Sequence, residues 1–349
     1  MSAALGLARR GLGVVAPNPA VGCILVKEGS VVGRGWTHPG GRPHAETVAL
    51  AAAGDAAVGA TAYVTLEPCA HTGKTPPCAQ ALIDAQVARC VVAIKDPDPR
   101  VSGKGVEMLE AAGIDVEVGA MADSAYELNR GFLSKVNQGR PLIALKLASS
   151  LDGRIALASG ESKWITSGEA RQFGHMLRAQ YDGILVGSGT LIADDPALDC
   201  RVPGLNDRSP TPIILDGSFR ITPDHKVARQ GAIVFHTKRD TTKEQALEKM
   251  GVELVPGATR DLPVVLNKLA ERGLTRILVE GGGQVHASFL KAGLADAIEH
   301  FQAGLALGGD GRAAIGTLDL ASLANAPHFN LKSVRQLGPD MLASYSKAE

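Results

Sequence analysis

The segment spanning residues 44–78 constrains this chain more than any other stretch. It opens with His44-Ala45-Glu46 and closes with Cys69, which follows a proline, and a second cysteine, Cys78. One imidazole and two thiolates suit Zn²⁺, and three protein ligands leave the fourth tetrahedral position open, as in catalytic zinc sites. Glu46 lies two residues beyond His44, within reach of a zinc-activated water. The sequence therefore predicts a catalytic zinc site with His44, Cys69 and Cys78 as ligands and Glu46 as the proton shuttle.

Each of these residues also has an ordinary structural interpretation. A single His or Cys is commonly a packed core residue, and two neighbouring cysteines can form a disulfide bond. However, the order H-x-E, then T-L-E-P-C, then a second Cys is typical of zinc-dependent deaminases of nucleobases. Eight residues separate Cys69 from Cys78, so the intervening segment, with Gly73 and two prolines, must loop out and return. The combined pattern favours the catalytic zinc site.

Length and charge limit the classes of function. A chain of 349 residues predicts two domains. Lys plus Arg and Asp plus Glu both total 36, so the formal charge is zero, which argues against an electrostatic footprint for nucleic acid. Aromatic residues make up only 4% of the chain, so platforms for base stacking are scarce. We expect small-molecule partners rather than nucleic acid.

The cysteines and the apolar runs indicate a compartment. Cys23, Cys90 and Cys200 lie in or beside apolar runs and are predicted to be core or near-core residues rather than disulfide partners. No signal peptide is evident before Pro17, and no window reaches the roughly 18 apolar residues that span a membrane. A cytoplasmic protein without a membrane partner is expected.

Strands and helices alternate in the N-terminal part, which predicts an α/β sandwich. His44 and Glu46 fall in the first turn of one predicted helix, and Cys78 lies near the start of another, where the helix dipole stabilises a thiolate. Two helix starts therefore converge on one metal. The predicted strands span residues 21–26, 31–36, 61–66, 89–95 and 115–118, and the helices 1–10, 44–53, 78–86, 106–112 and 124–136.

Residues 137–141 read as a linker, after which a second α/β series begins. The predicted domains are therefore residues 1–139 and 140–349. Thr166 and Glu169 have the T-x-x-E form of a capping box, which predicts a helix running to about residue 181. The other predicted helices span residues 263–272 and begin near 285. The predicted strands span residues 142–148, 183–186, 212–216, 232–236, 252–255 and 276–280, with two more within 329–346.

Three consecutive glycines, Gly281-Gly282-Gly283, stand between a predicted strand and a predicted helix. Backbone N–H groups and the helix dipole at such a junction can hold a phosphate. The triplet is not G-x-G-x-x-G and gives no evidence for a dinucleotide-binding fold of that type. A plain turn is the alternative interpretation.

Taken together, the motifs of both halves resemble the bifunctional deaminase–reductase family of riboflavin biosynthesis. The resemblance extends nearly end to end, and the long spacing between Cys69 and Cys78 is the spacing of this family. The motifs that carry it are Pro17-Asn18-Pro19, Val21-Gly22-Cys23, His44-Ala45-Glu46, Glu67-Pro68-Cys69, Thr75-Pro76-Pro77-Cys78, Leu145-Lys146-Leu147-Ala148, Ser150-Leu151-Asp152-Gly153, Trp164-Ile165-Thr166-Ser167, Ala193-Asp194-Asp195-Pro196, Arg201 and Glu280-Gly281-Gly282.

The resemblance implies a cytidine-deaminase-like α/β/α sandwich followed by a dihydrofolate-reductase-like α/β domain. It implies zinc-dependent hydrolytic deamination of 2,5-diamino-6-(5-phosphoribosylamino)pyrimidin-4(3H)-one. It then implies NADPH-dependent reduction of the ribosyl side chain to ribityl. It also implies one zinc ion and NADPH as cofactors, and homo-oligomers that pair through the reductase domain.

The resemblance also implies roles for individual residues. Asn18, Lys74 and Ser102 would contact the first substrate. The NADPH-binding positions would be Ala148, Trp164, Thr190, Asp194, Gly281, Gly282 and Gly283. Ser162, Arg178, Arg201 and Glu280 would bind the second substrate, and two cations with a hydroxyl form a suitable phosphate cradle.

Two residues keep alternative interpretations. Asn18 lies between prolines, so it is either a loop residue or a substrate contact. Lys146 either faces the ribose of the second substrate or is a solvated lysine at a strand edge.

Two other functions compete with this interpretation. One is a deaminase of RNA or DNA bases whose C-terminal half is a binding module, although the zero net charge and scarce aromatic residues argue against it. The other is a non-catalytic scaffold with a structural zinc ion. Glu46 opposes the scaffold, because a structural zinc site needs no proton shuttle.

Overall fold

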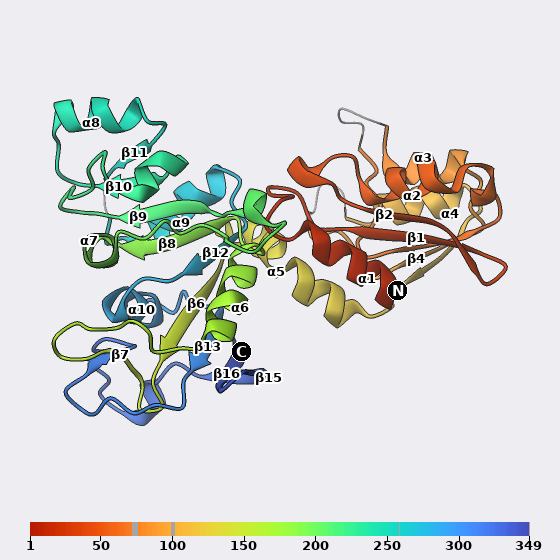
Figure 1. The fold of residues 1–349 in the computed structure, drawn as a ribbon. Coiled ribbons are helices and arrows are strands. Elements are labelled where there is room, and N and C mark those ends of the chain that lie inside the picture. Colours follow the sequence, from red (N-terminus) through yellow and green to blue (C-terminus); the bar gives the residue numbers. More distant parts are fainter. Residues whose placement is uncertain (72–75, 99–101, 258, 349) are drawn as a thin grey trace. The chain divides into compact units, whose positions relative to one another are not determined.

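A computed structural model describes residues 1–71, 76–98, 102–257 and 259–348 of the chain (Figure 1). Its contacts divide the chain into two compact units, Met1–Arg140 and Pro141–Glu349. This division lies one residue beyond the predicted domain boundary. Each unit contains its own sheet and its own hydrophobic core.

The N-terminal unit is built on a five-stranded sheet with the strand order β2-β1-β3-β4-β5. β1 is antiparallel to both β2 and β3, whereas β3, β4 and β5 are parallel to one another. The carboxyl ends of β3 and β4 therefore open at the same edge of the sheet. The strands are β1 (Gly22–Lys27), β2 (Ser30–Trp36), β3 (Thr61–Val64), β4 (Arg89–Val92) and β5 (Asp115–Val118).

Helices cover both faces of this sheet (Figure 1). α2, α3 and α4 pack together on one face, and α1 and α5 lie on the other. Glycines allow the close packing: a Cβ atom at Gly35 would lie 2.0 Å from the carbonyl oxygen of Ala45, and one at Gly22 would lie 2.0 Å from that of Ala4. The predicted α/β sandwich is confirmed. The helices are α1 (Ser2–Ala8), α2 (Ala45–Ala53), α3 (Cys78–Asp84), α4 (Lys104–Ala111) and α5 (Ala122–Gln138).

The predicted linker at residues 137–141 is partly wrong. α5 continues through Asn137 and Gln138, and Gly139 ends it in the left-handed conformation with φ of 67°. Glycine adopts this conformation without steric cost, which is why it commonly ends helices.

The C-terminal unit contains a nine-stranded sheet with the order β11-β10-β9-β8-β12-β6-β13-β16-β15. The strands from β11 to β13 are parallel, and the antiparallel hairpin of β15 and β16 completes one edge. β7 (Arg154–Ala156) and β14 (Arg312–Ala313) form a separate pair. The sheet strands are β6 (Leu142–Ser149), β8 (Gly183–Gly187), β9 (Thr211–Leu215), β10 (Ile233–His236), β11 (Glu253–Pro256), β12 (Arg276–Val279), β13 (Ala297–Gln302), β15 (Phe329–Leu337) and β16 (Asp340–Lys347).

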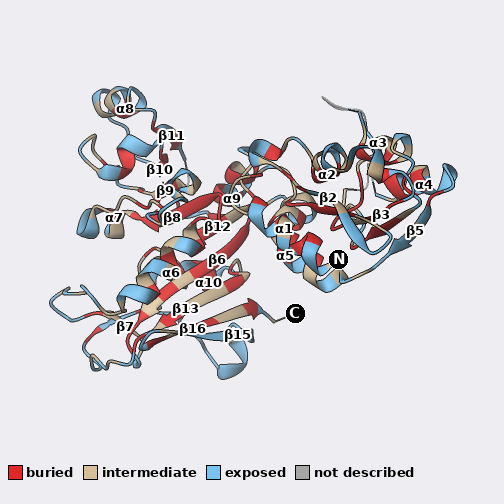
Figure 2. Ribbon diagram, turned by 45° about the vertical axis from the view of Figure 1, so that its right-hand side comes forward, coloured by how far each residue is buried: buried red, intermediate tan, exposed pale blue. Residues whose placement is uncertain are grey.

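Apolar side chains from α9 and α10 pack against one face of this sheet, and those from α6, α7 and α8 pack against the other. The central strands are consequently buried (Figure 2). This second α/β layer arrangement also agrees with the prediction. The helices are α6 (Gly168–Arg178), α7 (Ser188–Asp194), α8 (Thr241–Glu248), α9 (Leu262–Glu271) and α10 (Gly283–Lys291).

The predicted capping box at Thr166 is wrong. Ser167 is the N-cap of α6, and its hydroxyl accepts a hydrogen bond of 3.2 Å from the backbone N–H of Ala170. The backbone N–H of Ser167 itself donates to the Asp340 carboxylate at 2.6 Å. The contact with β16 therefore holds Ser167 at the start of the helix, and α6 ends at Arg178 rather than near residue 181.

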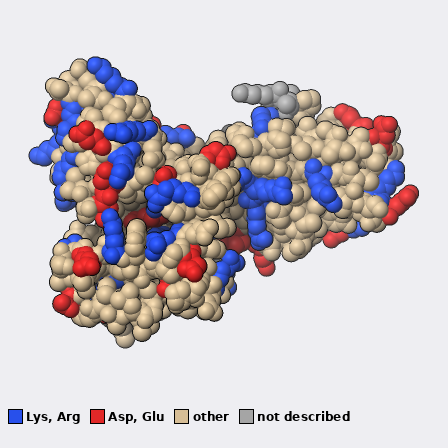
Figure 3. All heavy atoms as spheres, in the orientation of Figure 1, with Lys and Arg blue, Asp and Glu red and all other residues tan. Residues whose placement is uncertain are grey.

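The distribution of charged residues and of cysteines agrees with the expectations from the sequence. Acidic and basic side chains are interspersed on the face of the C-terminal unit shown in Figure 3. Cys23, Cys90 and Cys200 are buried, as predicted. Among the described residues, no helix is both long and apolar enough to cross a membrane.

Candidate functional site

Three ligand atoms meet where α2 and α3 begin. His44 is the N-cap of α2, Cys69 lies in the turn that follows β3, and Cys78 is the first residue of α3. Nδ1 of His44 lies 3.2 Å from Sγ of Cys78 and 3.7 Å from Sγ of Cys69. A tetrahedral zinc ion with ordinary bond lengths separates an imidazole nitrogen from a thiolate sulfur by about 3.5 Å. The two distances bracket this value, so the donor set fits zinc.

The two thiols are electrostatically unequal. The pKa of Cys69 is lowered to about 4, because the Cys78 thiol donates a hydrogen bond to it and His44 lies beside it. The backbone N–H of Cys78 also donates to Sγ of Cys69 at 3.3 Å. Conversely, the pKa of Cys78 is raised by its interaction with Cys69 and by burial. Zinc binds cysteine as the thiolate, so metal binding would release any proton that the two thiols still hold.

Glu46 lies beside the ligands and is buried, with 3% of its surface exposed. Its Oε2 atom has no hydrogen-bond partner among the described residues. Burial raises the pKa of Glu46 to about 7. A carboxyl group with a pKa near neutrality can both accept and return a proton. The position of Glu46 therefore suits the predicted proton shuttle.

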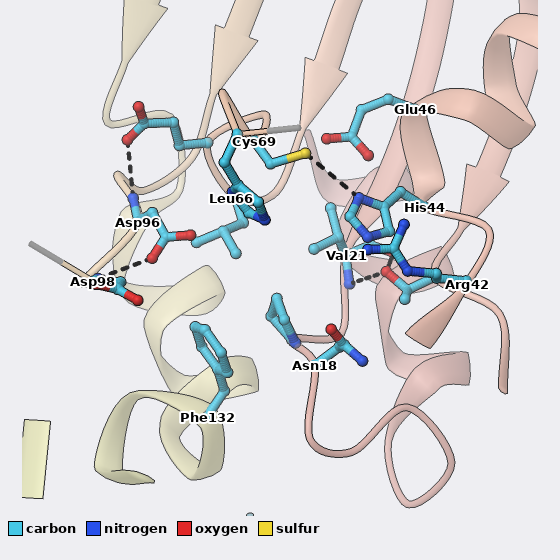
Figure 4. Close-up of a pocket in the computed structure, with 14 residues that line it drawn as sticks. Asn18, Val21, Arg42, His44, Glu46, Leu66, Cys69, Asp96, Asp98 and Phe132 are labelled. Atoms are coloured by element: carbon cyan, nitrogen blue, oxygen red, sulfur yellow. Dashed lines mark hydrogen bonds between the residues drawn. The ribbon is translucent and has the colours of Figure 1, made fainter. Parts of the chain in front are cut away.

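A cavity of about 460 Å³ opens in front of these residues (Figure 4). Its size is that of a pocket for a small organic molecule. His44, Glu46 and Arg42 lie on one side in this view, and Asp96 and Asp98 lie on the other. Asn18 and Phe132 also contribute to the lining. The cavity thus has an acidic wall, formed by Asp96 and Asp98, and also contains the predicted zinc ligands His44 and Cys69.

The substrate residues predicted for this unit have different outcomes. Asn18 lines the cavity, as a substrate contact would. Ser102 is exposed and does not line it; its backbone N–H donates to the carbonyl oxygen of Asp98 at 2.8 Å. Lys74 lies outside the described residues.

Sequence reasoning missed Arg42, Asp96 and Asp98 as cavity residues. Asp96 and Asp98 belong to the Asp96-Pro97-Asp98-Pro99 motif, which follows β4. Because β3 and β4 are parallel neighbours, this motif and Cys69 emerge at the same edge. The alternation of strands and helices could therefore have identified the two aspartates.

In the C-terminal unit, a buried cluster joins Lys146, Arg178 and Glu280. Nε and Nη2 of Arg178 each lie 2.8 Å from a different carboxylate oxygen of Glu280, and Nζ of Lys146 lies 3.5 Å from one of these oxygens. Burial alone would raise the pKa of Glu280, but the two cations hold it well below its ordinary value. β6 lies between β12 and β13, so the interpretation of Lys146 as a strand-edge lysine is wrong.

Arg178 and Arg201, two residues of the predicted phosphate cradle, both contact Asp199. Arg178 donates to the carbonyl oxygen of Asp199 at 2.8 Å, and Arg201 lies 3.4 Å from the Asp199 carboxylate. Nη2 of Arg201 also lies 3.1 Å from Nε2 of His175. No hydrogen bond or ion pair joins Ser162 to either arginine within the part of the chain that the structure describes. Asp199 thus links the two arginines, and the cradle that they would form with Ser162 stays a prediction.

The glycine turn and Thr190 come together at the carboxyl edge of the sheet. Gly282 donates its backbone N–H to Oγ1 of Thr190 at 3.2 Å, since β8 and β12 are parallel neighbours. A Cβ atom at Gly283 would lie 2.6 Å from the carbonyl oxygen of Ala313, so only glycine fits there. Ligands of open α/β sheets bind at this edge. The arrangement suits a phosphate-bearing cofactor.

The other predicted cofactor residues are more dispersed. Ala148 lies near the end of β6, beside Phe301 of β13. Trp164 is 68% exposed, with the guanidinium of Arg171 4.4 Å from its ring centre. Asp194 is exposed at the end of α7, and the neighbouring Asp195, not Asp194, pairs with Lys226 at 3.4 Å. Of the predicted cofactor residues, Thr190 and Gly282 thus share a direct hydrogen bond.

Comparison with known proteins covers both units. Residues 1–94 match the cytidine and deoxycytidylate deaminase zinc-binding region, and residues 141–343 match the RibD C-terminal domain. The riboflavin biosynthesis protein RibD of Escherichia coli is 44% identical, with 98% of this chain and 96% of that protein covered. RibD of Aquifex aeolicus is 42% identical, with coverages of 99% and 97%.

Solved structures agree along the whole chain. The structure of Acinetobacter baumannii RibD, form 1, is 41% identical and covers 100% of this chain and 98% of its own, with a TM-score of 0.91. A Thermotoga maritima diaminohydroxyphosphoribosylaminopyrimidine deaminase/5-amino-6-(5-phosphoribosylamino)uracil reductase is 35% identical, with coverages of 100% and 97% and a TM-score of 0.90. This chain belongs to the bifunctional deaminase–reductase family of riboflavin biosynthesis.

Proposed function

We propose that this chain catalyses two consecutive steps of riboflavin biosynthesis. The first is hydrolytic deamination of 2,5-diamino-6-(5-phosphoribosylamino)pyrimidin-4(3H)-one, and the second is NADPH-dependent reduction of the ribosyl side chain to ribityl. The observation that carries the proposal is the set of His44, Cys69 and Cys78 at the cavity, with Glu46 buried beside them.

In the deamination, zinc held by these three ligands would supply Lewis-acid activation of a water molecule. Glu46 would accept a proton from the attacking water and return it to the leaving amine, a role that its buried position at the cavity supports. Asn18 and Lys74 are proposed to hold the substrate. Asn18 has the support of its position in the cavity lining.

In the reduction, NADPH supplies the hydride, and the protein must orient the nicotinamide and the sugar while excluding water. We assign the cofactor to the Gly281-Gly282-Gly283 turn with Thr190, and the sugar to Lys146 and Glu280. Arg178 already forms two hydrogen bonds with Glu280, whereas Arg201 is 62% exposed in its side chain. Arg201 is therefore the better placed of the two arginines to meet the substrate phosphate.

The protein is also proposed to form homo-oligomers through the reductase unit. The outermost strand β15 exposes Leu331 and Val334, each by 56%. An exposed edge strand with apolar side chains is a natural surface for pairing with a second copy.

Mass spectrometry with the diaminopyrimidinone substrate tests both activities. Zinc-loaded protein is expected to exchange an amino group for oxygen without NADPH, and to add two hydrogens only when NADPH is present. Glu46→Ala should retain zinc and lose the exchange. A zinc-loaded wild-type protein that shows no exchange would contradict the proposal and return the nucleic-acid base deaminase to consideration.

A further inference from the structure

We propose that Glu67 is a positioning residue for deamination, which sets the width of the substrate cavity. Its carboxylate connects the turn that carries the ligand Cys69 with the loop that carries Asp96. The inference rests on the proposed deaminase function. Glu67 does not act on the substrate itself; it acts through the residues that it holds in place.

The carboxylate of Glu67 accepts four backbone hydrogen bonds. Oε2 accepts from the N–H groups of Asp96 and Gly103, each at 3.0 Å. Oε1 accepts from Gly105 at 2.9 Å and from Val106 at 3.3 Å. The residue is 4% exposed, so these donors replace water almost completely. One side chain thereby holds both the segment that follows β4 and the first turn of α4.

The backbone around Glu67 reinforces this connection. The N–H of Glu67 donates to the carbonyl oxygen of Ile94 at 2.9 Å. A Cβ atom at Gly105 would lie 1.9 Å from the carbonyl oxygen of Pro68, so the first turn of α4 directly contacts the turn that carries Cys69. Cys69 is the next residue after Pro68. A displacement of the loop would therefore change its distance from the metal ligands.

The loop held by Glu67 forms the acidic wall of the cavity. Asp96 and Asp98 line it across from His44 and Glu46 (Figure 4). The N–H of Asp98 donates to Oδ1 of Asp96 at 2.9 Å, so the two aspartates move together. The position of Asp96 relative to His44 thus depends on the hydrogen bonds of Glu67.

The substitution Glu67→Gln tests this role with almost no change in side-chain volume. An amide has one acceptor oxygen, and its NH₂ group would face two N–H donors. We expect KM of the deamination to rise about 10- to 100-fold, because a displaced acidic wall would weaken binding of the substrate and of the transition state alike. The zinc content and the reductase activity should stay unchanged, and kcat should fall by less than about threefold, because Glu46 and the ligands remain.

Asp182→Asn is the matched control. Asp182 is also a buried carboxylate that accepts backbone N–H groups, from Thr275 and Arg276, but it lies in the C-terminal unit. This variant should leave KM of the deamination unchanged. A rise equal to that of Glu67→Gln would contradict the inference.

Gly105→Ala provides a second variant, because it displaces the loop while Glu67 stays intact. It should also raise KM of the deamination while zinc and reductase activity are retained. An unchanged KM in both variants would overturn the inference. The inference would also be overturned if Glu67→Gln lost zinc and had a lower kcat but an unchanged KM. That result would assign Glu67 to the metal site alone. A wild-type chain without deaminase activity would instead refute the proposed function.

Discussion

Arg178 and Glu280 form a bidentate ion pair across 102 residues of sequence, with two nitrogen–oxygen distances of 2.8 Å. The pair joins the end of α6 to the residue that follows β12. Both side chains are largely withdrawn from water, with 15% and 9% exposed. Such a pair fixes the relative positions of the two elements more strongly than it stabilises the fold.

Arg178→Met should lower the free energy of unfolding, because it leaves Glu280 with Lys146 as the cation beside it. Removal of one partner of a buried pair costs about 3 to 5 kcal/mol, and Lys146 places the expected value at the lower end. Urea denaturation followed by circular dichroism, which does not depend on substrate binding, measures the loss. The double variant Arg178→Met/Glu280→Gln should recover at least half of it, and a single variant as stable as the wild type would refute the prediction.

Removal of zinc should abolish deamination and preserve reduction, because the donor set belongs to the N-terminal unit. Chelation followed by zinc analysis and both activity assays measures this. Cys78→Ala should likewise lose zinc. Cys90→Ala removes another buried cysteine of the same unit and should retain both zinc and activity; equal zinc loss in the two variants would argue against the assigned ligands.

Asn129→Ala should destabilise the N-terminal unit and raise KM of the deamination. The side chain of Asn129 accepts from the N–H of Ala20 at 2.9 Å and donates to its carbonyl oxygen at 3.2 Å. The adjacent Pro19 and Val21 line the cavity. Leaving these buried groups unpaired costs about 1 to 3 kcal/mol. Thermal unfolding measures the loss of stability, and deamination kinetics measure KM. The control is Asn137→Ala, at an exposed position of α5, which should change neither the stability nor KM.

Thr190→Val should weaken NADPH binding, because Gly282 would lose the hydroxyl that accepts its N–H. A net hydrogen bond contributes about 1 kcal/mol, so KM for NADPH should rise roughly 5- to 10-fold. Steady-state reductase kinetics provide the measurement. Thr190→Ser retains the hydroxyl and should behave as the wild type, whereas identical KM values in all three proteins would exclude a role for this contact.

Acidification should destabilise the C-terminal unit through His300. Burial lowers the pKa of His300, whose Nε2 lies 2.8 Å from Oγ of Ser149. The unfolded chain therefore binds a proton at higher pH than the folded chain. The contribution of neutral His300 to the free energy of unfolding is fully present above the unfolded pKa of about 6.5, and it falls as the pH drops below that value. For one such group, the free energy of unfolding changes by at most about 1.4 kcal/mol per pH unit.

Urea denaturation at several pH values between 5 and 8, monitored by reductase activity, tests this dependence. His300→Gln should reduce the slope. His328→Gln, at an exposed position, should leave it unchanged. A slope that His300→Gln does not alter would assign the acid sensitivity to other groups.

Features set by a few consecutive residues were predictable from the sequence. The placement of His44 at a helix start requires only local backbone geometry, and the periodicity of apolar residues identifies most strands. The spacing of Glu46 from His44 likewise predicts which carboxylate lines the cavity together with His44 and Cys69. The boundaries were less predictable: Ser167 rather than Thr166 caps α6 because Asp340, 173 residues away, accepts its N–H.

Long-range partners required the tertiary structure. The sequence shows Lys146 on a strand but not that this strand lies between β12 and β13, which places the ammonium beside Glu280. Glu67 likewise reads as part of a ligand motif, whereas its four donors come from a loop 29 to 39 residues later. Sequence determines ligand spacing and local periodicity because they depend on bond geometry over one or two turns. Strand order, which decides which side chains meet, depends on how whole faces bury their apolar surface.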